Sequence, residues 1–235
     1  MCGRYSLTTP LEAMRQIFGF VGGYNLPARY NIAPTQDVPV VVKTTIEAVP
    51  KLVAMRWGLV PSWAKDLSIG AKMINARVET AATKPSFRAA FRRRHCIVPA
   101  DGFYEWKTIA GSKQPFRISL ADNTPFGFAG LWENWMDPGG DELLTCTILT
   151  TDASDRLRSI HHRMPVILQP DNYDHWLNSE NPFPGDLEQP FESEALRFYP
   201  VSKDVNKPVN DGPACFEQVD LAQPETKKPE QGSLF

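Results

Sequence analysis

The chain has 235 residues, of which 42% are hydrophobic and 22% are charged, and its formal net charge is −2. These values are ordinary for a globular protein with a substantial core. They exclude a wholly disordered chain and a protein that binds nucleic acid through its overall charge. No apolar run reaches transmembrane length and the N-terminus lacks a signal-peptide pattern, so the sequence predicts one cytoplasmic domain without a membrane partner.

The first predicted element is a short helix over residues 11–20. Thr9, Pro10 and Glu12 match the N-cap, N1 and N3 positions of a capping box. In that motif the side chains of the N-cap and N3 residues satisfy free backbone N–H groups of the first turn. The pattern therefore predicts a helix start at Thr9 and Pro10, directly before this segment.

The remaining predicted elements are mostly strands. Pro39 cannot donate a backbone hydrogen bond, which restricts its strand to a sheet edge or a strand start, and Pro85 interrupts a helical pattern. Strands are predicted over residues 37–43, 53–63, 95–100, 102–109, 115–120, 126–133, 143–151 and 164–169, with helices over residues 78–94, 154–160 and 170–178. The strands between residues 95 and 151 follow one another across turn sequences, which predicts an antiparallel meander.

The cysteines indicate neither a metal site nor disulfides. They are widely separated, without a CxxC pair, and they are Cys2, Cys96, Cys146 and Cys215. In a reducing compartment they are expected to be free thiols, and no metal or cofactor is expected.

Cys2 directly follows the initiator methionine. Aminopeptidases remove Met1 when the next side chain is small, so the mature chain is expected to begin with Cys2. A free α-amine titrates near ~8 and a thiol near ~8.5, so neutral amine and thiolate are both expected near physiological pH. Cys2 would then be a 1,2-aminothiol, which condenses with aldehydes.

Three segments place polar side chains among apolar neighbours. Asn75, Arg77 and Glu79 alternate in MINARVET and are expected on one side of an extended segment. Glu105 lies in the aromatic strand GFYEWK, where burial would raise its pKa, although the alternation also permits a solvent-facing residue. His161 directly precedes a predicted buried strand. It is either a catalytic residue or a hydrogen-bonded residue of the turn.

Basic residues are concentrated although the chain as a whole is not basic. This concentration favours a local basic groove. The residues near aromatic and glycine-rich loops are Arg4, Arg29, Arg56, Arg77 and Arg163, and a separate run consists of Arg92, Arg93 and Arg94.

Six motifs occur in an order that resembles the SRAP family, the proteins that capture abasic sites in single-stranded DNA. They are CGRY, ARYNIAP, RWGLVPSW, INARVET, PADGFYEWK and IHHRMPVIL, between about residues 2 and 213. The bacterial members are the most similar. The resemblance implies an α+β fold, mainly antiparallel β, in a barrel-like single domain with short peripheral helices. This domain is expected over residues 2–215, and the polar residues 216–235 are expected to form a disordered tail.

The resemblance also assigns site residues. Cys2 resembles the residue that forms the covalent link, Asn75 the amide that lines the site and Glu105 the catalytic carboxylate. His161 resembles the catalytic histidine, rather than His162, because the family pattern is Ile-His-x-Arg-x-Pro.

The DNA contacts implied by the resemblance come from Arg4, Asn31, Trp63, Arg77 and Arg163, with Arg77 and Arg163 on the DNA backbone. Ala64 stands where the family often has a second aromatic residue, so Trp63 is the single aromatic at that point.

The implied activity is covalent capture of DNA during the DNA damage (SOS) response. The Cys2 amine forms a Schiff base with the ring-opened sugar of an abasic site, and the thiol closes a thiazolidine ring. The expected partner is single-stranded DNA, bound by a monomer. A lyase side activity and the peptidase (N-terminal self-processing) activity in the family's name are also implied.

Two other functions remain open on the residues alone. Glutamine amidotransferases also begin Met-Cys-Gly, and release of ammonia from glutamine would reveal such a hydrolase. A noncatalytic single-strand-binding module would stack bases on Trp57, Trp63 and Trp106 and would bind intact and abasic DNA alike.

The end of the chain, QGSLF, suggests a further partner. Gln231, Leu234 and Phe235 resemble the pentapeptide that docks on the bacterial sliding clamp, although Gly232 replaces the leucine usual at the second position. Two large apolar residues at the end of a polar tail have no core to join and suit a pocket on another protein.

Overall fold

The computed structural model describes residues 2–43, 49–179, 189–191 and 194–221, and its centre is a closed barrel of five strands. Around the barrel β10 pairs with β4, β4 with β3, β3 with β6, β6 with β9, and β9 with β10. Only the β10–β4 pairing is parallel, and the other four are antiparallel. The strands are β3 (Asp37–Val42), β4 (Lys51–Trp57), β6 (His95–Ala100), β9 (Phe126–Met136) and β10 (Glu142–Asp152).

Three short strands extend the barrel sheet. β5 (Asn75–Arg77) runs parallel to β10, β11 (Arg163–Pro165) pairs antiparallel with β10, and β12 (Ile167–Leu168) pairs antiparallel with β9. β5 and β11 therefore both lie against β10, and this brings together two segments that are far apart in the sequence.

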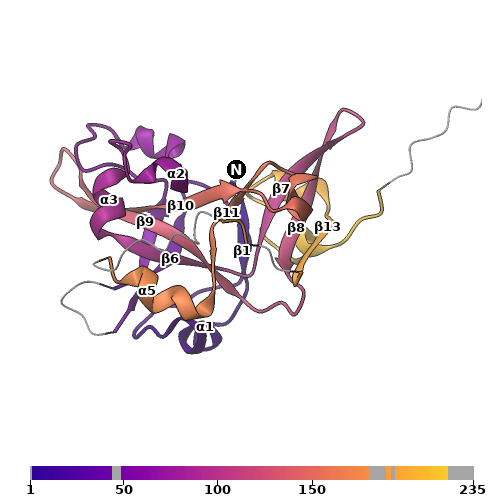
Figure 1. The fold of residues 1–235 in the computed structure, drawn as a ribbon, viewed down its shortest axis with the longest axis horizontal. Helices are drawn as coiled ribbons and strands as arrows, with labels where there is room; N and C mark the ends of the chain where they lie inside the picture. Colours follow the sequence, from indigo (N-terminus) through magenta and orange to yellow (C-terminus); the bar gives the residue numbers. More distant parts are fainter. Residues whose placement is uncertain (1, 44–48, 180–188, 192–193, 222–235) are drawn as a thin grey trace, which may run out of the picture.

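A second, fully antiparallel sheet lies beside the barrel, with the strand order β13-β8-β7-β1-β2 (Figure 1). Its strands are β1 (Tyr5–Leu7), β2 (Arg29–Ile32), β7 (Gly102–Ile109), β8 (Ser112–Leu120) and β13 (Leu196–Pro200). The predicted mainly antiparallel, barrel-like domain is confirmed.

The predicted meander is wrong at two steps, because β6, β9 and β10 belong to the barrel sheet whereas β7 and β8 belong to the second sheet. The first of these steps is from β6 to β7. Asp101 is the single residue between them, and its buried carboxylate accepts hydrogen bonds from Ser6 Oγ at 2.6 Å and Thr8 N at 2.5 Å. Arg117 Nη2 donates to the Asp101 carbonyl at 3.0 Å. These contacts fix the point at which the chain leaves the barrel.

The helices are short and peripheral, as predicted. They are α1 (Leu11–Phe18), α2 (Val78–Ala81), α3 (Arg88–Arg93), α4 (Asp155–Arg158) and α5 (Tyr173–Leu177), with a 3₁₀ helix η1 (Leu67–Lys72). Pro85 separates α2 from α3. No helix in the described ranges is both long and apolar enough to cross a membrane.

Two details of the strand and helix predictions need correction. α1 is capped by Pro10 without a side-chain hydrogen bond, because the Thr9 hydroxyl lies 3.5 Å from Asp101 Oδ2 instead. β3 is not an edge strand, since it lies between β4 and β6. Pro39 is tolerated there because only Val41 and Val42 of this strand pair with β6.

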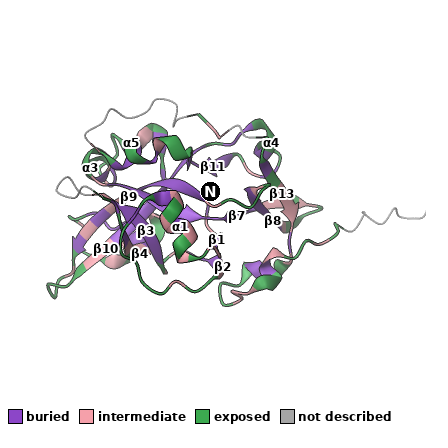
Figure 2. Cartoon of the chain, turned by 90° about the horizontal axis from the view of Figure 1, so that it is seen from below, coloured by how far each residue is buried: buried purple, intermediate pink, exposed green. Residues whose placement is uncertain are grey.

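The core joins the two sheets next to the N-terminus. Tyr5 of β1 is fully buried and packs edge-on against Trp57 and Phe128 of the barrel, with ring centroids 5.3 and 5.9 Å apart. Figure 2 shows the buried strands of both sheets around the N-terminal segment. The chain is therefore anchored three residues after Cys2.

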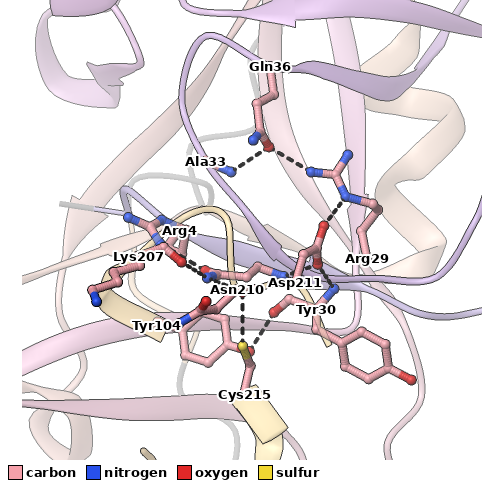
Figure 3. A network of polar contacts seen from close by, with 11 residues as sticks. Arg4, Arg29, Tyr30, Ala33, Gln36, Tyr104, Lys207, Asn210, Asp211 and Cys215 are labelled. Carbon is pink, nitrogen blue, oxygen red and sulfur yellow. Dashed lines mark hydrogen bonds and ion pairs between the residues drawn. The ribbon is translucent and has the colours of Figure 1, made fainter. Parts of the chain in front are cut away.

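Residues 201–219 form a C-terminal strap that the sequence did not predict. It contains the 3₁₀ helices η4 (Lys203–Asn206) and η5 (Pro213–Phe216), and it packs on β2 (Figure 3). Phe216 lies under the Arg117 guanidinium at 3.9 Å, and Val219 N donates to Pro200 O at 3.0 Å. Residues 216–219, predicted as tail, therefore pack on the domain, and Gln231, Leu234 and Phe235 lie outside the described residues.

Candidate active site

Cys2 is fully buried at the junction of the two sheets. Its carbonyl oxygen accepts a hydrogen bond from Asn75 Nδ2 at 2.7 Å, and its Sγ lies 4.0 Å from the Arg4 carbonyl oxygen. Tyr104 N donates to the same Arg4 carbonyl at 2.9 Å. The backbone of the first residues is therefore held from both sides, by β5 and by β7.

Asn75 is positioned by the barrel. It lies opposite Ile148 in the β5–β10 ladder, and the preceding carbonyl of Ile74 accepts a hydrogen bond from Trp57 Nε1 at 2.9 Å. Asn75 Oδ1 is buried and has no hydrogen-bond partner within the part of the chain that the structure describes. One end of the amide thus fixes Cys2, and the other end is an acceptor that a ligand or the freed α-amine can use.

Glu105 of β7 is a buried carboxylate, with 5% of its surface exposed, which excludes the solvent-facing alternative. Burial raises its pKa above the ordinary value of a glutamate. Two effects raise the pKa of the Cys2 thiol. The larger is the burial of the thiol, and the second is the negative charge of the Glu105 carboxylate. The expectation of substantial thiolate at neutral pH is therefore corrected: in this structure the thiol needs a base to deprotonate it.

His161 and Glu105 line one narrow hollow at the surface. Its other lining residues are Phe103, Ile118, Leu157, Ile160, Arg163 and Met164. His161 Nδ1 lies 3.0 Å from both the amide nitrogen and the carbonyl oxygen of Arg163, so the turn fixes the ring. Burial lowers the pKa of His161, which keeps the imidazole neutral near pH 7.

Arg163 supports this turn. Its side chain is 7% exposed, and its guanidinium donates to Glu79 Oε1 at 2.6 Å, Asp152 Oδ1 at 2.7 Å and the Thr150 carbonyl at 2.6 Å. The Arg163 guanidinium, which was predicted to contact the DNA backbone, is therefore already bound to two carboxylates and a carbonyl. The geometry favours a role in positioning His161 instead. Glu79 and Asp152 as its partners were not identified from the sequence, which separates them from Arg163 by 84 and 11 residues.

Two of the predicted DNA-contact residues are accessible. Trp63 is 59% exposed, and Arg77 is exposed at the end of β5, without an ion pair among the described residues. The loop that carries Trp63 is tied down by Trp135 Nε1, which donates to Ala64 O at 2.8 Å. Gly58 and Gly70 close its base, because a Cβ on Gly58, where φ is +132°, would lie 2.6 Å from Gly70 O.

Asn31 and Arg4 have structural roles that the prediction of DNA contacts did not include. Asn31 is fully buried; its Nδ2 donates to the carbonyls of Val205, Lys207 and Asn210 in the strap, at 3.2, 3.1 and 2.7 Å. Its Oδ1 accepts from Arg4 Nη1 at 2.9 Å.

Asp211 supports the same attachment from the strap, accepting from the backbone N–H groups of Tyr30 at 2.5 Å and Asn31 at 2.8 Å, and pairing with Arg29 (Figure 3). Asn31 thus links the strap to the residue two positions after Cys2.

We expect Asn31→Ala to lower the free energy of unfolding by about 2–3 kcal/mol, because it removes the buried hydrogen bonds that this amide makes with three carbonyls and with the Arg4 guanidinium. Denaturant titration measures this, with the exposed Asn25→Ala as the matched control. Equal unfolding midpoints for Asn31→Ala and the wild type would show that these contacts contribute no stability.

Comparison with known proteins identifies the family of this chain. The SOS response associated peptidase (SRAP) family model matches residues 1–208. The abasic site processing protein YoqW of Bacillus subtilis is 42% identical over 224 residues, which cover 92% of this chain and 99% of that protein. The abasic site processing protein HMCES of Gallus gallus is 36% identical over 202 residues, which cover 75% of this chain and 60% of that protein.

The fold is also found among solved structures. The crystal structure of a protein from Bacteroides thetaiotaomicron superimposes with a TM-score of 0.82 at 27% identity, covering 93% of this chain and 100% of that one. The chain belongs to the SRAP family.

Proposed function

We propose that the protein recognises abasic sites in single-stranded DNA and links to them covalently through Cys2 after removal of Met1. The observation that carries this proposal is the 2.7 Å hydrogen bond from Asn75 to the Cys2 carbonyl, which holds an N-terminal aminothiol beside the buried carboxylate of Glu105. Relatives named abasic site processing proteins support the choice of substrate.

The reaction begins with the sugar. An abasic deoxyribose is in equilibrium with a ring-opened aldehyde at C1′, and opening moves the hydroxyl proton away while the ring oxygen gains one. Arg163 holds His161 at Nδ1, and the low pKa keeps the ring neutral, so Nε2 is the nitrogen that exchanges a proton with the sugar oxygen. The Cys2 amine then attacks C1′ to form a carbinolamine. Loss of water, with proton transfer through Glu105, gives the Schiff base.

Ring closure follows within the same residue. The Cys2 sulfur forms a bond to C1′, the electron pair of the C=N bond moves to nitrogen, and Glu105 carries the thiol proton to that nitrogen. The product is a five-membered thiazolidine, and the whole sequence releases one water. The reaction is intramolecular, which supplies a high effective concentration of the thiol.

Two lesser activities follow from the same site. A Schiff base that eliminates the neighbouring phosphate before ring closure cleaves the strand, which gives a weak lyase activity. The family name includes a peptidase; removal of Met1 by an aminopeptidase would expose the amine of Cys2.

The test is incubation of the mature protein with a single-stranded oligonucleotide that carries one abasic site. We expect a denaturant-resistant band whose mass equals protein plus DNA minus one water, and no band with intact DNA. The glutamine amidotransferase alternative would instead release ammonia from glutamine and leave the oligonucleotide unlinked.

The C-terminal QGSLF is the basis of a second, separate prediction. A peptide spanning residues 227–235 is expected to bind the bacterial sliding clamp in the micromolar range, since a short peptide loses conformational entropy when it docks. Calorimetric titration measures this, with Leu234→Ala, Phe235→Ala in the same peptide as the control. An absence of heat and of competition with a known clamp ligand would contradict the clamp interaction and leave the Cys2 chemistry unaffected.

A further inference from the structure

The segment that follows the site has an unusual charge. Between Thr80 and His95 the chain contains five basic residues and no acidic residue, although the whole chain carries a formal charge of −2. Arg94 has partners within the protein, since it forms an ion pair with Glu133 at 3.1 Å and lies over the Trp132 ring at 5.7 Å. The other four bases, Lys84, Arg88, Arg92 and Arg93, are exposed.

Three of these bases form a row at the start of α3 and along one of its faces. Arg88 and Arg92 lie four residues apart on α3, which places them on the same face with a rise of about 6 Å along the axis. Lys84 lies in the turn before the helix, and its carbonyl accepts a hydrogen bond from Arg88 N at 2.9 Å. Phe87 and Ala90 on the opposite side are buried and fix the orientation of the helix.

No acidic side chain neutralises this row in the described part of the chain, where Lys84, Arg88 and Arg92 make no salt bridge. Three neighbouring cations without a counter-charge repel one another, and the phosphates of a nucleic acid would neutralise them. Such binding releases the counterions that are condensed on the nucleic acid.

The row is continuous with the candidate active site. β5 carries Asn75 at the site and ends at the exposed Arg77; α2 follows directly, and Lys84 N donates to Thr80 O at the end of that helix at 3.0 Å. In Figure 1, α2 lies between the N-terminus and α3 along the long axis, with β8 and β13 at the opposite end. A strand that leaves the site over Arg77 and α2 therefore reaches the row.

We propose that Lys84, Arg88 and Arg92 bind the phosphates of the DNA flanking the abasic nucleotide, as a second contact surface outside the site. The inference rests on the proposed function in that the ligand is DNA, but it concerns noncovalent binding. It predicts that flanking DNA contributes affinity through charge and without sequence preference.

The test is the salt dependence of equilibrium binding to intact DNA, which requires no reaction at Cys2. The variant Lys84→Gln, Arg88→Gln, Arg92→Gln is compared with wild type on a single-stranded oligonucleotide and on one with a duplex flank. Loss of three phosphate contacts reduces the slope of log K against log salt by about 2 for a single strand and about 3 for a duplex. Between 50 and 200 mM salt, the loss of affinity is then smaller by about 20-fold or about 40-fold.

The matched control is Arg197→Gln, Lys203→Gln, Lys207→Gln, which removes three exposed bases from β13 and the strap. It should keep the wild-type slope on both ligands. A change in the α3 variant on the single strand alone, or on the duplex flank alone, assigns the row to that form of DNA.

Wild-type slopes for the α3 variant on both ligands, or an equal loss in the control, would overturn the proposal. Thermal unfolding at the wild-type temperature establishes that each variant is folded. If crosslinking fails while the slope still changes, the proposed chemistry is wrong and the binding surface stands.

Discussion

Cys2→Ala should abolish the heat-stable crosslink to an abasic oligonucleotide, by at least a hundredfold on a denaturing gel. The variant keeps an N-terminal amine, but it lacks the sulfur that converts the reversible Schiff base into a ring. The same expectation holds for a wild-type chain that retains Met1, since the amine then belongs to another residue. Mass spectrometry of the intact chain establishes which N-terminus is present.

A hydride reductant separates the two stages of this reaction. Cys2→Ala and Cys2→Ser should both give a covalent band when borohydride is present, because reduction traps the Schiff base that their amines still form. Cys96→Ala, which removes another buried thiol, should crosslink like the wild type. A stable band from Cys2→Ala at the wild-type level, without reductant, would disprove the thiazolidine.

The sequence predicted most local elements but only part of their arrangement. Strand and helix positions followed from alternation and from prolines such as Pro85, which act locally. The assignment of β6 and β7 to different sheets did not, because it depends on the hydrogen bonds that Asp101 receives from Ser6 and Thr8, more than ninety residues earlier. Such long-range contacts leave no periodic signal.

In the candidate site, too, the sequence predicted the residues in motifs but not the long-range contacts between them. Cys2, Asn75 and Glu105 were predicted from motifs, and the structure brings Asn75 onto the Cys2 carbonyl and the Glu105 charge close enough to raise the pKa of the thiol. Burial could not be inferred for Asn31, whose motif suggested a DNA contact. Its partners are backbone carbonyls of the strap. Every residue type has a backbone carbonyl, so the sequence of the strap does not reveal these contacts.

Glu105→Gln should slow crosslink formation by about a hundredfold or more, because it removes the group that accepts the amine and thiol protons but keeps the shape of the side chain. His161→Ala should slow formation, or reversal of the adduct, to a similar extent. Noncovalent binding of both variants to intact single strands should change little. If Glu105→Gln and His161→Ala both form the crosslink at the wild-type rate, the assignment of Glu105 and His161 as proton-transfer residues is wrong.

The control for Glu105 is Glu133→Gln, since Glu133 is also a buried carboxylate whose pKa is raised by burial, but it lies on β9 and pairs with Arg94. It should react at the wild-type rate. If Glu133→Gln lost as much activity, the effect of Glu105→Gln would reflect the loss of a buried charge in general.

The pH dependence tests the same residue through its ionisation. Glu105 acts as a base only when deprotonated, so the wild-type rate should fall as the pH is lowered through its pKa. Burial raises that pKa, so the fall begins at a higher pH than for an ordinary glutamate. The Cys2 amine must also be neutral to attack, which adds a second fall below about pH 8. In Glu105→Gln the dependence on Glu105 disappears, whereas the dependences on the amine and on His161 are common to both proteins, so the ratio of wild-type to variant rates should shrink as the pH falls. A constant ratio across the acidic range would show that the Glu105 carboxylate transfers no proton in the rate-limiting step.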